Sequence, residues 1–231
     1  MNTPFDIDKI TIEVQEKLYK GNSEKLIKKA HRDLTKFGNK KISKNNKFYS
    51  NILEIGSGSG ELFEHVDKNF NKYYMTDISE WGKSKIEELA KEDSRIKFEI
   101  QDIEKLKFSG HTFDRVLVSC VLAHVKEPYQ ALEELRRVTK KNGIISIYLS
   151  TDPSLLLRLI RRILIKNKMK GLPIPYDLCN SVLHRNNPKA VIDMVRWIYQ
   201  YDEIKIDYYP FKMKSWNLST HIIVNINKKT D

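Results

Sequence analysis

The chain has 231 residues, of which 40% are hydrophobic and 10% aromatic. This length suits one α/β domain with a full core, and the composition excludes a disordered chain. No apolar run approaches the ~20 residues that span a bilayer. The first twenty residues mix charges with no apolar stretch, so no secretory signal is expected. Two cysteines make no disulfide framework, which favours a reduced, cytoplasmic location.

The net charge of +11 is unevenly distributed, with +6 on residues 1–50, −2 on 51–150 and +7 on 151–231. Basic flanks around a near-neutral middle indicate an anionic partner, which could be nucleic acid, a phosphorylated substrate or an acidic membrane surface. A lysine-rich composition that only aids solubility gives the same pattern. Both interpretations stay open at this stage.

Apolar spacing predicts a helix over residues 8–36, interrupted at Gly21-Asn22. Strands and helices then alternate. The expected strands are 52–55, 73–76, 95–100, 113–119 and 144–149. The expected helices are 61–69, 79–91 and 128–139, the last one ended by Asn142-Gly143. This alternation predicts a parallel sheet with right-handed crossovers.

The pattern changes after residue 150. Asp152-Pro153 predicts a helix start, with Asp152 as the cap of a helix over 154–166. A second helix is expected over 188–201. Residues 204–208 and 221–226 alternate as strands do and are expected to pair at one edge of the sheet.

Glycines follow the first strand in the order Gly56-Ser57-Gly58-Ser59-Gly60. Such a loop lets a ligand approach the backbone. Glu61 stands where the dinucleotide pattern G-x-G-x-x-G needs its third glycine, so a dinucleotide is not favoured. Asp77, at the tip of the second strand, is placed to accept hydrogen bonds from ribose hydroxyls. Asp102, at the tip of the third strand, is placed to accept a hydrogen bond from an adenine amino group.

These segments resemble known motifs. Leu53 to Gly60 looks like the first motif of class I S-adenosylmethionine-dependent methyltransferases, and Tyr74 to Ser79 resembles their acidic second motif. Phe113 to Val125, with Glu134 to Val138 and Asn142-Gly143, is similar to later motifs of the subgroup that acts on small molecules, lipids and glycans. The resemblance covers roughly residues 50–150. Asn142 stands where the family often has a second glycine.

The resemblance implies a Rossmann-like, seven-stranded, mostly parallel sheet with an antiparallel last strand and helices on both faces. We expect a single methyltransferase domain over residues 1–231. Its expected parts are an N-terminal helical cap (1–49), a cofactor-binding core (50–150), a substrate or lid insertion (151–186), and a C-terminal helix with edge strands (187–231).

The implied cofactor is S-adenosylmethionine. The glycine loop would contact its methionine part, Asp77 the ribose and Asp102 the adenine, while the residues after the fourth strand would lie beside the sulfonium. The full set of expected cofactor-binding residues is Glu54, Gly56, Ser57, Gly58, Gly60, Asp77, Ile78, Asp102, Ile103, Ser119 and Cys120. No metal is expected.

Two histidines are candidate general bases, because an imidazole can remove a proton near neutral pH. His184 lies in the expected substrate insertion and is the better candidate. His124 follows the fourth strand, and for it a structural role is favoured. Both assignments are hypotheses.

Residues 154–168 combine leucine and isoleucine with Arg158, Arg161, Arg162 and Lys166 on one helical face. This pattern is typical of a helix lying on an anionic membrane, here the inner membrane surface. A surface helix packed on the sheet gives the same pattern.

The first functional hypothesis is methylation of an oxygen or nitrogen atom of a small molecule, such as a sugar or glycan precursor or a lipid-linked intermediate. Tyr208 to Phe211 and Ser215 to Leu218 resemble, weakly, methyltransferases of bacterial surface-polysaccharide pathways. An RNA methyltransferase is the alternative suggested by the basic flanks, but the chain has no recognisable RNA-binding module and no Asn/Asp-Pro-Pro-Tyr/Phe sequence. A catalytically inactive binding protein with the same fold is the third possibility. The oligomeric state is left open.

Overall fold

The computed structural model describes residues 28–36, 48–164, 181 and 183–230. Residues 28–36 are helical and form the end of the helix expected over 8–36, whose remainder lies outside the described residues. The strands are β1 Tyr49–Ile55, β2 Phe70–Asp77, β3 Ile96–Ile100, β4 Phe113–Ser119, β5 Thr139–Ser150, β6 Glu203–Tyr209 and β7 His221–Asn227. The helices are η1 Glu61–His65, α3 Lys83–Glu92, α4 Pro128–Val138, α5 Leu155–Leu164, α7 Pro188–Ile198 and η2 Trp216–Leu218.

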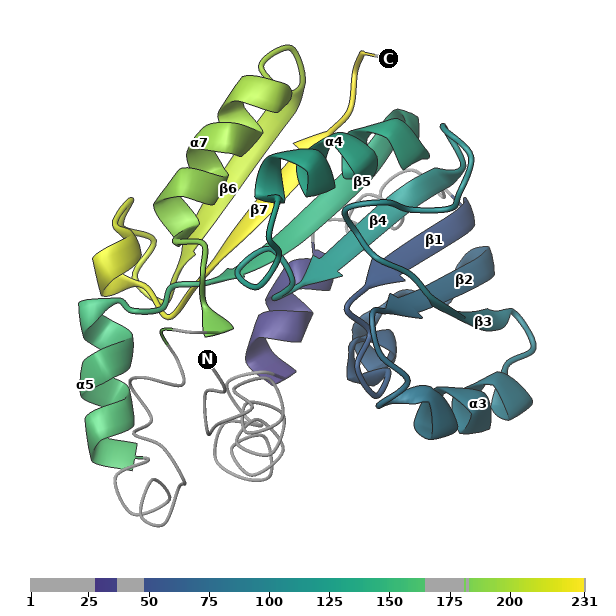
Figure 1. Ribbon diagram of the computed structural model, residues 1–231, viewed down its shortest axis with the longest axis horizontal. Coiled ribbons are helices and arrows are strands. Elements are labelled where there is room, and N and C mark those ends of the chain that lie inside the picture. The colour runs from purple at the N-terminus through teal and green to yellow at the C-terminus, as the bar shows by residue number, and fades with distance from the viewer. Residues whose placement is uncertain (1–27, 37–47, 165–180, 182, 231) are drawn as a thin grey trace, which may run out of the picture.

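The seven strands form one sheet in the order β3-β2-β1-β4-β5-β7-β6 (Figure 1). β7 runs antiparallel to both of its neighbours, and the other paired strands are parallel. The expected fold class is therefore confirmed, including the pair of strands at one edge. β1 lies between β2 and β4, so the strand order reverses there. At such a switch point a crevice opens outside the carboxyl ends of the strands, where α/β sheets bind ligands.

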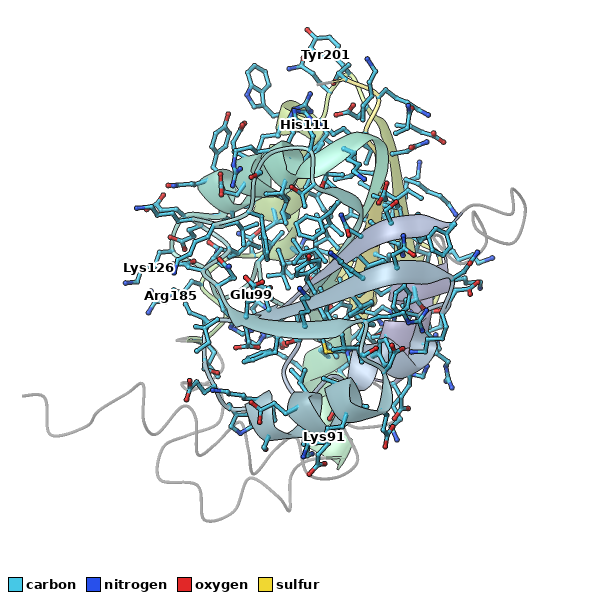
Figure 2. The ribbon with its side chains drawn as sticks, turned by 90° about the vertical axis from the view of Figure 1, so that its right-hand side faces the viewer. Lys91, Glu99, His111, Lys126, Arg185 and Tyr201 are labelled. Atoms are coloured by element: carbon cyan, nitrogen blue, oxygen red, sulfur yellow. The ribbon has the colours of Figure 1, made fainter. Side chains whose placement is uncertain are left out.

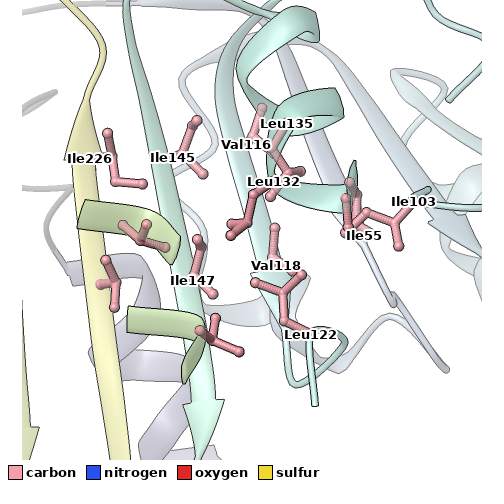
Figure 3. Close-up of a cluster of buried hydrophobic side chains, with 14 of the residues drawn as sticks. Ile55, Ile103, Val116, Val118, Leu122, Leu132, Leu135, Ile145, Ile147 and Ile226 are labelled. Atoms are coloured by element: carbon pink, nitrogen blue, oxygen red, sulfur yellow. The ribbon is translucent and has the colours of Figure 1, made fainter. Parts of the chain in front are cut away.

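Helices cover both faces of the sheet. α4 and α7 pack on one face, over side chains such as Val116, Val118 and Ile145 (Figures 1 and 3). The opposite face packs against η1, α3 and Leu34 of the helix over 28–36. Burying alternate strand residues on both faces leaves the strand ends as the accessible part of the sheet.

The helix expected over residues 61–69 is a wrong prediction. Only the single turn of η1 forms, and β2 already begins at Phe70. Phe63, Phe70 and Tyr73 pack their rings against one another in the core, with centroids 5.1 to 6.1 Å apart. Placing Phe70 in the sheet buries it fully, which outweighs the helical spacing of this short stretch.

Two expected helix ends also differ. α4 ends at Val138, and Thr139 already pairs with Phe113, so Asn142 lies inside β5. Asn142 keeps the left-handed conformation, with φ 60°, and its N–H donates to the Lys228 carbonyl at 2.7 Å. Asn142 therefore belongs to an irregular part of strand β5 and does not end a helix.

Asp152 does not cap α5. Its carboxylate accepts a hydrogen bond from the Ser150 hydroxyl at 2.9 Å. The Ser154 Oγ accepts the Leu157 N–H instead, at 3.2 Å, which is the contact of a helix N-cap. The remaining helices and strands lie where expected, with ends shifted by a few residues. In the part of the chain that the structure describes, no helix is long and apolar enough to cross a membrane.

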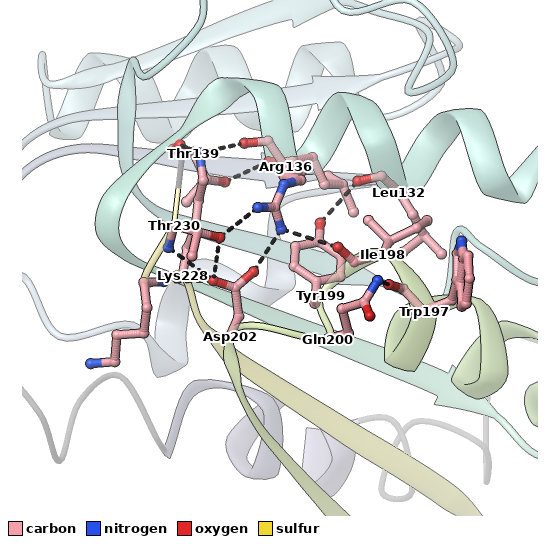
Figure 4. A network of polar contacts seen from close by, with 12 residues as sticks. Leu132, Arg136, Thr139, Trp197, Ile198, Tyr199, Gln200, Asp202, Lys228 and Thr230 are labelled. Carbon is pink, nitrogen blue, oxygen red and sulfur yellow. Dashed lines mark hydrogen bonds and ion pairs between the residues drawn. The ribbon is translucent and has the colours of Figure 1, made fainter.

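A buried polar network joins α4 to the end of α7 and to the C-terminal segment (Figure 4). The Arg136 guanidinium contacts the Asp202 carboxylate at 2.6 Å and donates to the carbonyl of Ile198. Asp202 also accepts the N–H groups of Lys229 and Thr230. Burial raises the pKa of Asp202, but these hydrogen bonds outweigh it and hold the pKa below its ordinary value. The carboxylate is thus fully satisfied although it is buried.

Candidate functional site

The loop after β1 is shaped by its three glycines. Gly56, Gly58 and Gly60 all have positive φ, between 50° and 80°. A Cβ on Gly56 would lie 2.2 Å from Cγ2 of Val121, so no side chain fits there. The N–H groups of Gly56 and Ser57 donate to the Thr76 carbonyl, which fixes the loop to β2. The loop is therefore held close to the tips of β2 and β4.

Gly82, at the start of α3, was not singled out from the sequence. A Cβ on Gly82 would lie 1.6 Å from the carbonyl oxygen of Gly58. The glycine loop and the segment before α3 are thus in backbone contact. A lone glycine within the helix expected over 79–91 gives no sequence signal of such a long-range contact.

Asp77 ends β2 and faces the glycine loop. One of its carboxylate oxygens accepts the Gly58 N–H at 3.1 Å, and the other accepts the Ser79 N–H at 3.1 Å. The side chain is half-buried, so it retains lone pairs for a ligand hydroxyl. Ile78 beside it is 72% exposed, which leaves an apolar surface next to the carboxylate.

Asp102 follows β3, the neighbour of β2. Its carboxylate accepts the Glu104 N–H at 2.9 Å and remains exposed. Asp77 pairs with Ile100 across the two strands, so both carboxylates stand at the same edge of the sheet. Ile103 is buried in the core under α4 and α7. Its side chain is buried beside Asp102 and therefore has little exposed surface for a ligand.

Glu54 lies in the middle of the sheet and is fully buried. Its Oε2 accepts a hydrogen bond from the Tyr73 hydroxyl at 2.6 Å. Burial raises the pKa of Glu54 to about 8, although the Tyr73 hydrogen bond opposes this. Among the described residues, Oε1 of Glu54 and Oγ of Ser57 are buried without a hydrogen-bond partner. Two buried polar atoms without a partner at the glycine loop suit a ligand that brings polar groups of its own.

The residues at the end of β4 lie on the other side of the glycine loop from Asp77. Cys120 has positive φ, 59°, and its N–H donates to the Tyr148 carbonyl. The Ser119 hydroxyl lies 3.2 Å from Nε2 of His31, in the helix over 28–36. Burial lowers the pKa of His31 to about 4, so this imidazole is neutral. Sequence analysis missed His31, because its partner is 88 positions away.

The two candidate bases lie together, with ring centroids of His124 and His184 4.9 Å apart. His124 Nδ1 is 2.8 Å from the Leu183 carbonyl. Burial, reinforced by the neighbouring His184, lowers the pKa of His124 to about 4. His184 Nε2 lies 3.8 Å from a carboxylate oxygen of Asp152, which is itself buried. His184 therefore has an acidic neighbour that can orient it, and His124 is fixed to the backbone.

Two cations border this pair. Lys126 and Arg185 are both exposed and lie side by side in Figure 2. Asn186 joins their segments, since its side-chain amide donates to the carbonyls of Leu122 and Val125. A carboxylate lies beside them, since Glu104 accepts hydrogen bonds from the N–H groups of Lys126 and Glu127, so the charge here is mixed.

One group in the described part of the chain has the composition of a metal site. A sulfur or nitrogen atom of Cys120, His124 and His184 lies within 4.8 Å of each of the others. Thiolate and imidazole are ligands that zinc accepts. These three residues could hold a metal ion, although the sequence predicts none.

A second histidine–aspartate contact lies on the other face of the same edge. His221 Nε2 is 3.3 Å from the Asp33 carboxylate, and its ring stacks on Tyr209 at 4.7 Å. Burial lowers the pKa of His221 to about 4 despite the hydrogen bond with Asp33. This contact, which was not foreseen, ties the helix over 28–36 to the sheet.

Comparison with known proteins agrees with this arrangement. Residues 53–147 match the family model of the methyltransferase domain. The match begins at the strand before the glycine loop and ends in β5, so it contains every expected cofactor-binding residue. It indicates that the cofactor is S-adenosylmethionine.

Individual relatives match less than half of the chain. An uncharacterized methyltransferase of Schizosaccharomyces pombe is 34% identical over 108 residues, which are 41% of this chain and 37% of that protein. The chain spans less than half the length of the curated relatives it matches.

Solved structures resemble the chain over most of its length. The CurJ carbon methyltransferase has a TM-score of 0.63 at 20% identity, over 87% of this chain and 54% of that one. The N-methyltransferase NodS of Bradyrhizobium japonicum, solved with S-adenosyl-L-homocysteine, has a TM-score of 0.59 at 14% identity, over 92% and 91%. At these identities the likeness shows the fold.

Proposed function

We propose that this chain transfers the methyl group of S-adenosylmethionine to an oxygen or nitrogen atom of a small molecule. The observation that carries the proposal is the glycine loop fixed to Asp77, with two buried polar atoms beside it that lack a hydrogen-bond partner. NodS, which shares the fold, was solved with the demethylated form of this cofactor.

In this proposal each residue has one task. Glu54 and Ser57 accept hydrogen bonds from the methionine part, and Asp77 accepts hydrogen bonds from the ribose hydroxyls. Ile78 packs on the adenine, and Asp102 accepts a hydrogen bond from the adenine amino group. Bound at this site, the cofactor supplies an electrophilic methyl group, and the chain aligns the acceptor with it.

His184 is proposed to take the acceptor's proton, with Asp152 orienting the imidazole. His124 is proposed to position the segment that holds His184, because its ring is bonded to the Leu183 carbonyl and its lowered pKa makes it a poor base. The exposed cations Lys126 and Arg185 could pair with a phosphate on the acceptor, as in an activated sugar or a lipid-linked intermediate.

The test is a transfer assay with methyl-labelled S-adenosylmethionine and acceptors that include nucleotide sugars, lipid-linked sugars and RNA. We expect labelled product from a phosphorylated small molecule. His184→Gln should lower kcat about 100-fold or more while cofactor affinity stays unchanged. His124→Asn, which keeps a donor for the Leu183 carbonyl, should retain most of kcat.

Labelled RNA would instead support the RNA alternative. Cofactor binding without transfer to any class of acceptor would favour a binding protein with this fold. Equal losses in both histidine variants would refute the separate roles.

A further inference from the structure

The start of α5 and the β6–β7 loop expose large apolar side chains. We call this the edge patch. Its apolar members are Leu155, Leu159, Phe211, Met213 and Leu218, which are between 37% and 61% exposed. Monomeric proteins rarely expose several large apolar groups together unless that surface binds something.

Buried hydrogen bonds hold the two segments of the patch together. The hydroxyls of Thr151 and Ser154, just before α5, both donate to the Ser219 carbonyl, at 2.6 and 3.0 Å. Ser219 directly follows η2, and Figure 1 shows η2 beside the start of α5. The leucines of α5 and the loop therefore belong to one surface.

The charged side chains of the two segments that form the patch are all cations. Residues 153–160 and 208–220 contain Arg158, Lys212 and Lys214 and no aspartate or glutamate. All three cations are exposed, and the two lysines alternate with Phe211 and Met213 along the loop. Apolar side chains flanked by cations fit the interface of an anionic bilayer, where the former enter the acyl boundary and the latter meet the phosphates.

The patch also lies at the edge of the sheet that carries the candidate site. Tyr209 ends β6 and Ser150 ends β5, and both pair with His221 at the start of β7. Asp152, beside His184, precedes Leu155 by three positions. A surface bound to the patch would therefore adjoin the acceptor side of the site.

We propose that the edge patch docks this chain on an anionic phospholipid membrane. Docking is independent of the proposed methyl transfer. If both hold, the acceptor is a molecule that resides in or at the bilayer and reaches the site without leaving that surface.

The test is co-sedimentation of the full chain with phosphatidylcholine vesicles, with and without phosphatidylglycerol. We expect binding only to the mixed vesicles. Lys212→Gln/Lys214→Gln should weaken it about thirtyfold, because each lysine near such a surface contributes about 1 kcal/mol. Phe211→Ser/Met213→Ser should weaken it at least tenfold. Trp197→Ser, which removes a 67% exposed ring from α7, is the matched control and should bind as the parent does.

Every replaced side chain is exposed, and far-UV circular dichroism with a thermal melt checks the folding of each variant. Titration with S-adenosylmethionine in the same samples separates a failure of docking from a failure of the cofactor site. No binding to mixed vesicles, or equal binding by the parent and both double variants, would overturn the proposal. Binding to single-stranded RNA through the same residues, without vesicle binding, would replace it with a nucleic-acid surface.

Discussion

Glu54 illustrates what a single residue contributes to the site. Its carboxyl group is buried, bonded on one side to Tyr73 and unpaired on the other. With its pKa raised to about 8, the group holds a proton at neutral pH when no ligand is bound. A cationic ligand group at Oε1 would favour the carboxylate, so this residue couples the cofactor site to pH.

The first prediction concerns the stability of the unliganded protein. Because the pKa of Glu54 is raised above its unfolded value of 4.5, the folded state keeps a proton that the unfolded chain releases. Its contribution to stability is full below pH ~4.5 and is lost as the pH rises towards ~8, by up to about 1.4 kcal/mol for each pH unit. Glu54→Gln, which cannot ionise, should flatten this slope in urea unfolding between pH 5 and 8. Glu92→Gln, an exposed change on α3, should keep the parent's slope; identical slopes in all three proteins would refute the assignment.

At this scale, the sequence identified residues whose position follows from a strand tip or a motif. Gly56, Asp77 and Ser119 do lie together at one edge of the sheet. Partners joined only by the tertiary fold were missed. His221 and Asp33 are 188 positions apart, and no local pattern marks such a contact.

At the scale of helices and strands, prediction succeeded where one local signal was strong. The apolar run of β4 was predicted with its observed ends, Phe113 and Ser119. It failed where the fold overrode the local spacing, as in residues 61–69, where only Glu61–His65 is helical and β2 follows directly from Phe70. The cap of α5 failed similarly, because Asp152 is held by Ser150 and is turned toward His184.

Ser154 provides the prediction at this scale. Its Oγ accepts the Leu157 N–H and donates to the Ser219 carbonyl. Ser154→Ala should lower the free energy of unfolding by about 1–2 kcal/mol, because an N-cap is lost while Thr151 still bonds the same carbonyl. Denaturant unfolding measures the change. Ser84→Ala, at an exposed position inside α3, should be neutral or slightly stabilising. A loss for Ser154→Ala no larger than that control's would contradict the capping role.

At the scale of the whole molecule, buried polar contacts join segments that are distant along the chain. Arg136 of α4 holds Asp202, which in turn holds the backbone after β7. This network fixes the edge of the sheet formed by β7 and β6, which follow the matched residues 53–147 in the chain. Sequence patterns predict the strands there but not the ion pair that fixes them.

Asp202→Asn should lower the free energy of unfolding by about 3 kcal/mol, since Arg136 would lose its buried counter-charge. The pKa of Asp202 is held below its ordinary value, so its contribution is present above pH ~4 and is lost as the pH falls through the folded pKa. The parent should therefore lose more stability on acidification than the variant does. Asp193→Asn, on an exposed α7 pair, should cost less than about 1 kcal/mol. Equal costs for the two substitutions would show that the network does not stabilise the fold.

The most direct test of the central claim is a calorimetric titration of the purified chain with S-adenosylmethionine. The account predicts micromolar binding that Asp77→Ala weakens at least tenfold, because a ribose contact and the Gly58 anchor are both lost. Asp193→Ala, far from the glycine loop in sequence and exposed, should bind as the parent does. No binding by the parent chain, or equal affinity in the Asp77→Ala variant, would contradict the assignment of the glycine loop and Asp77 as the cofactor site.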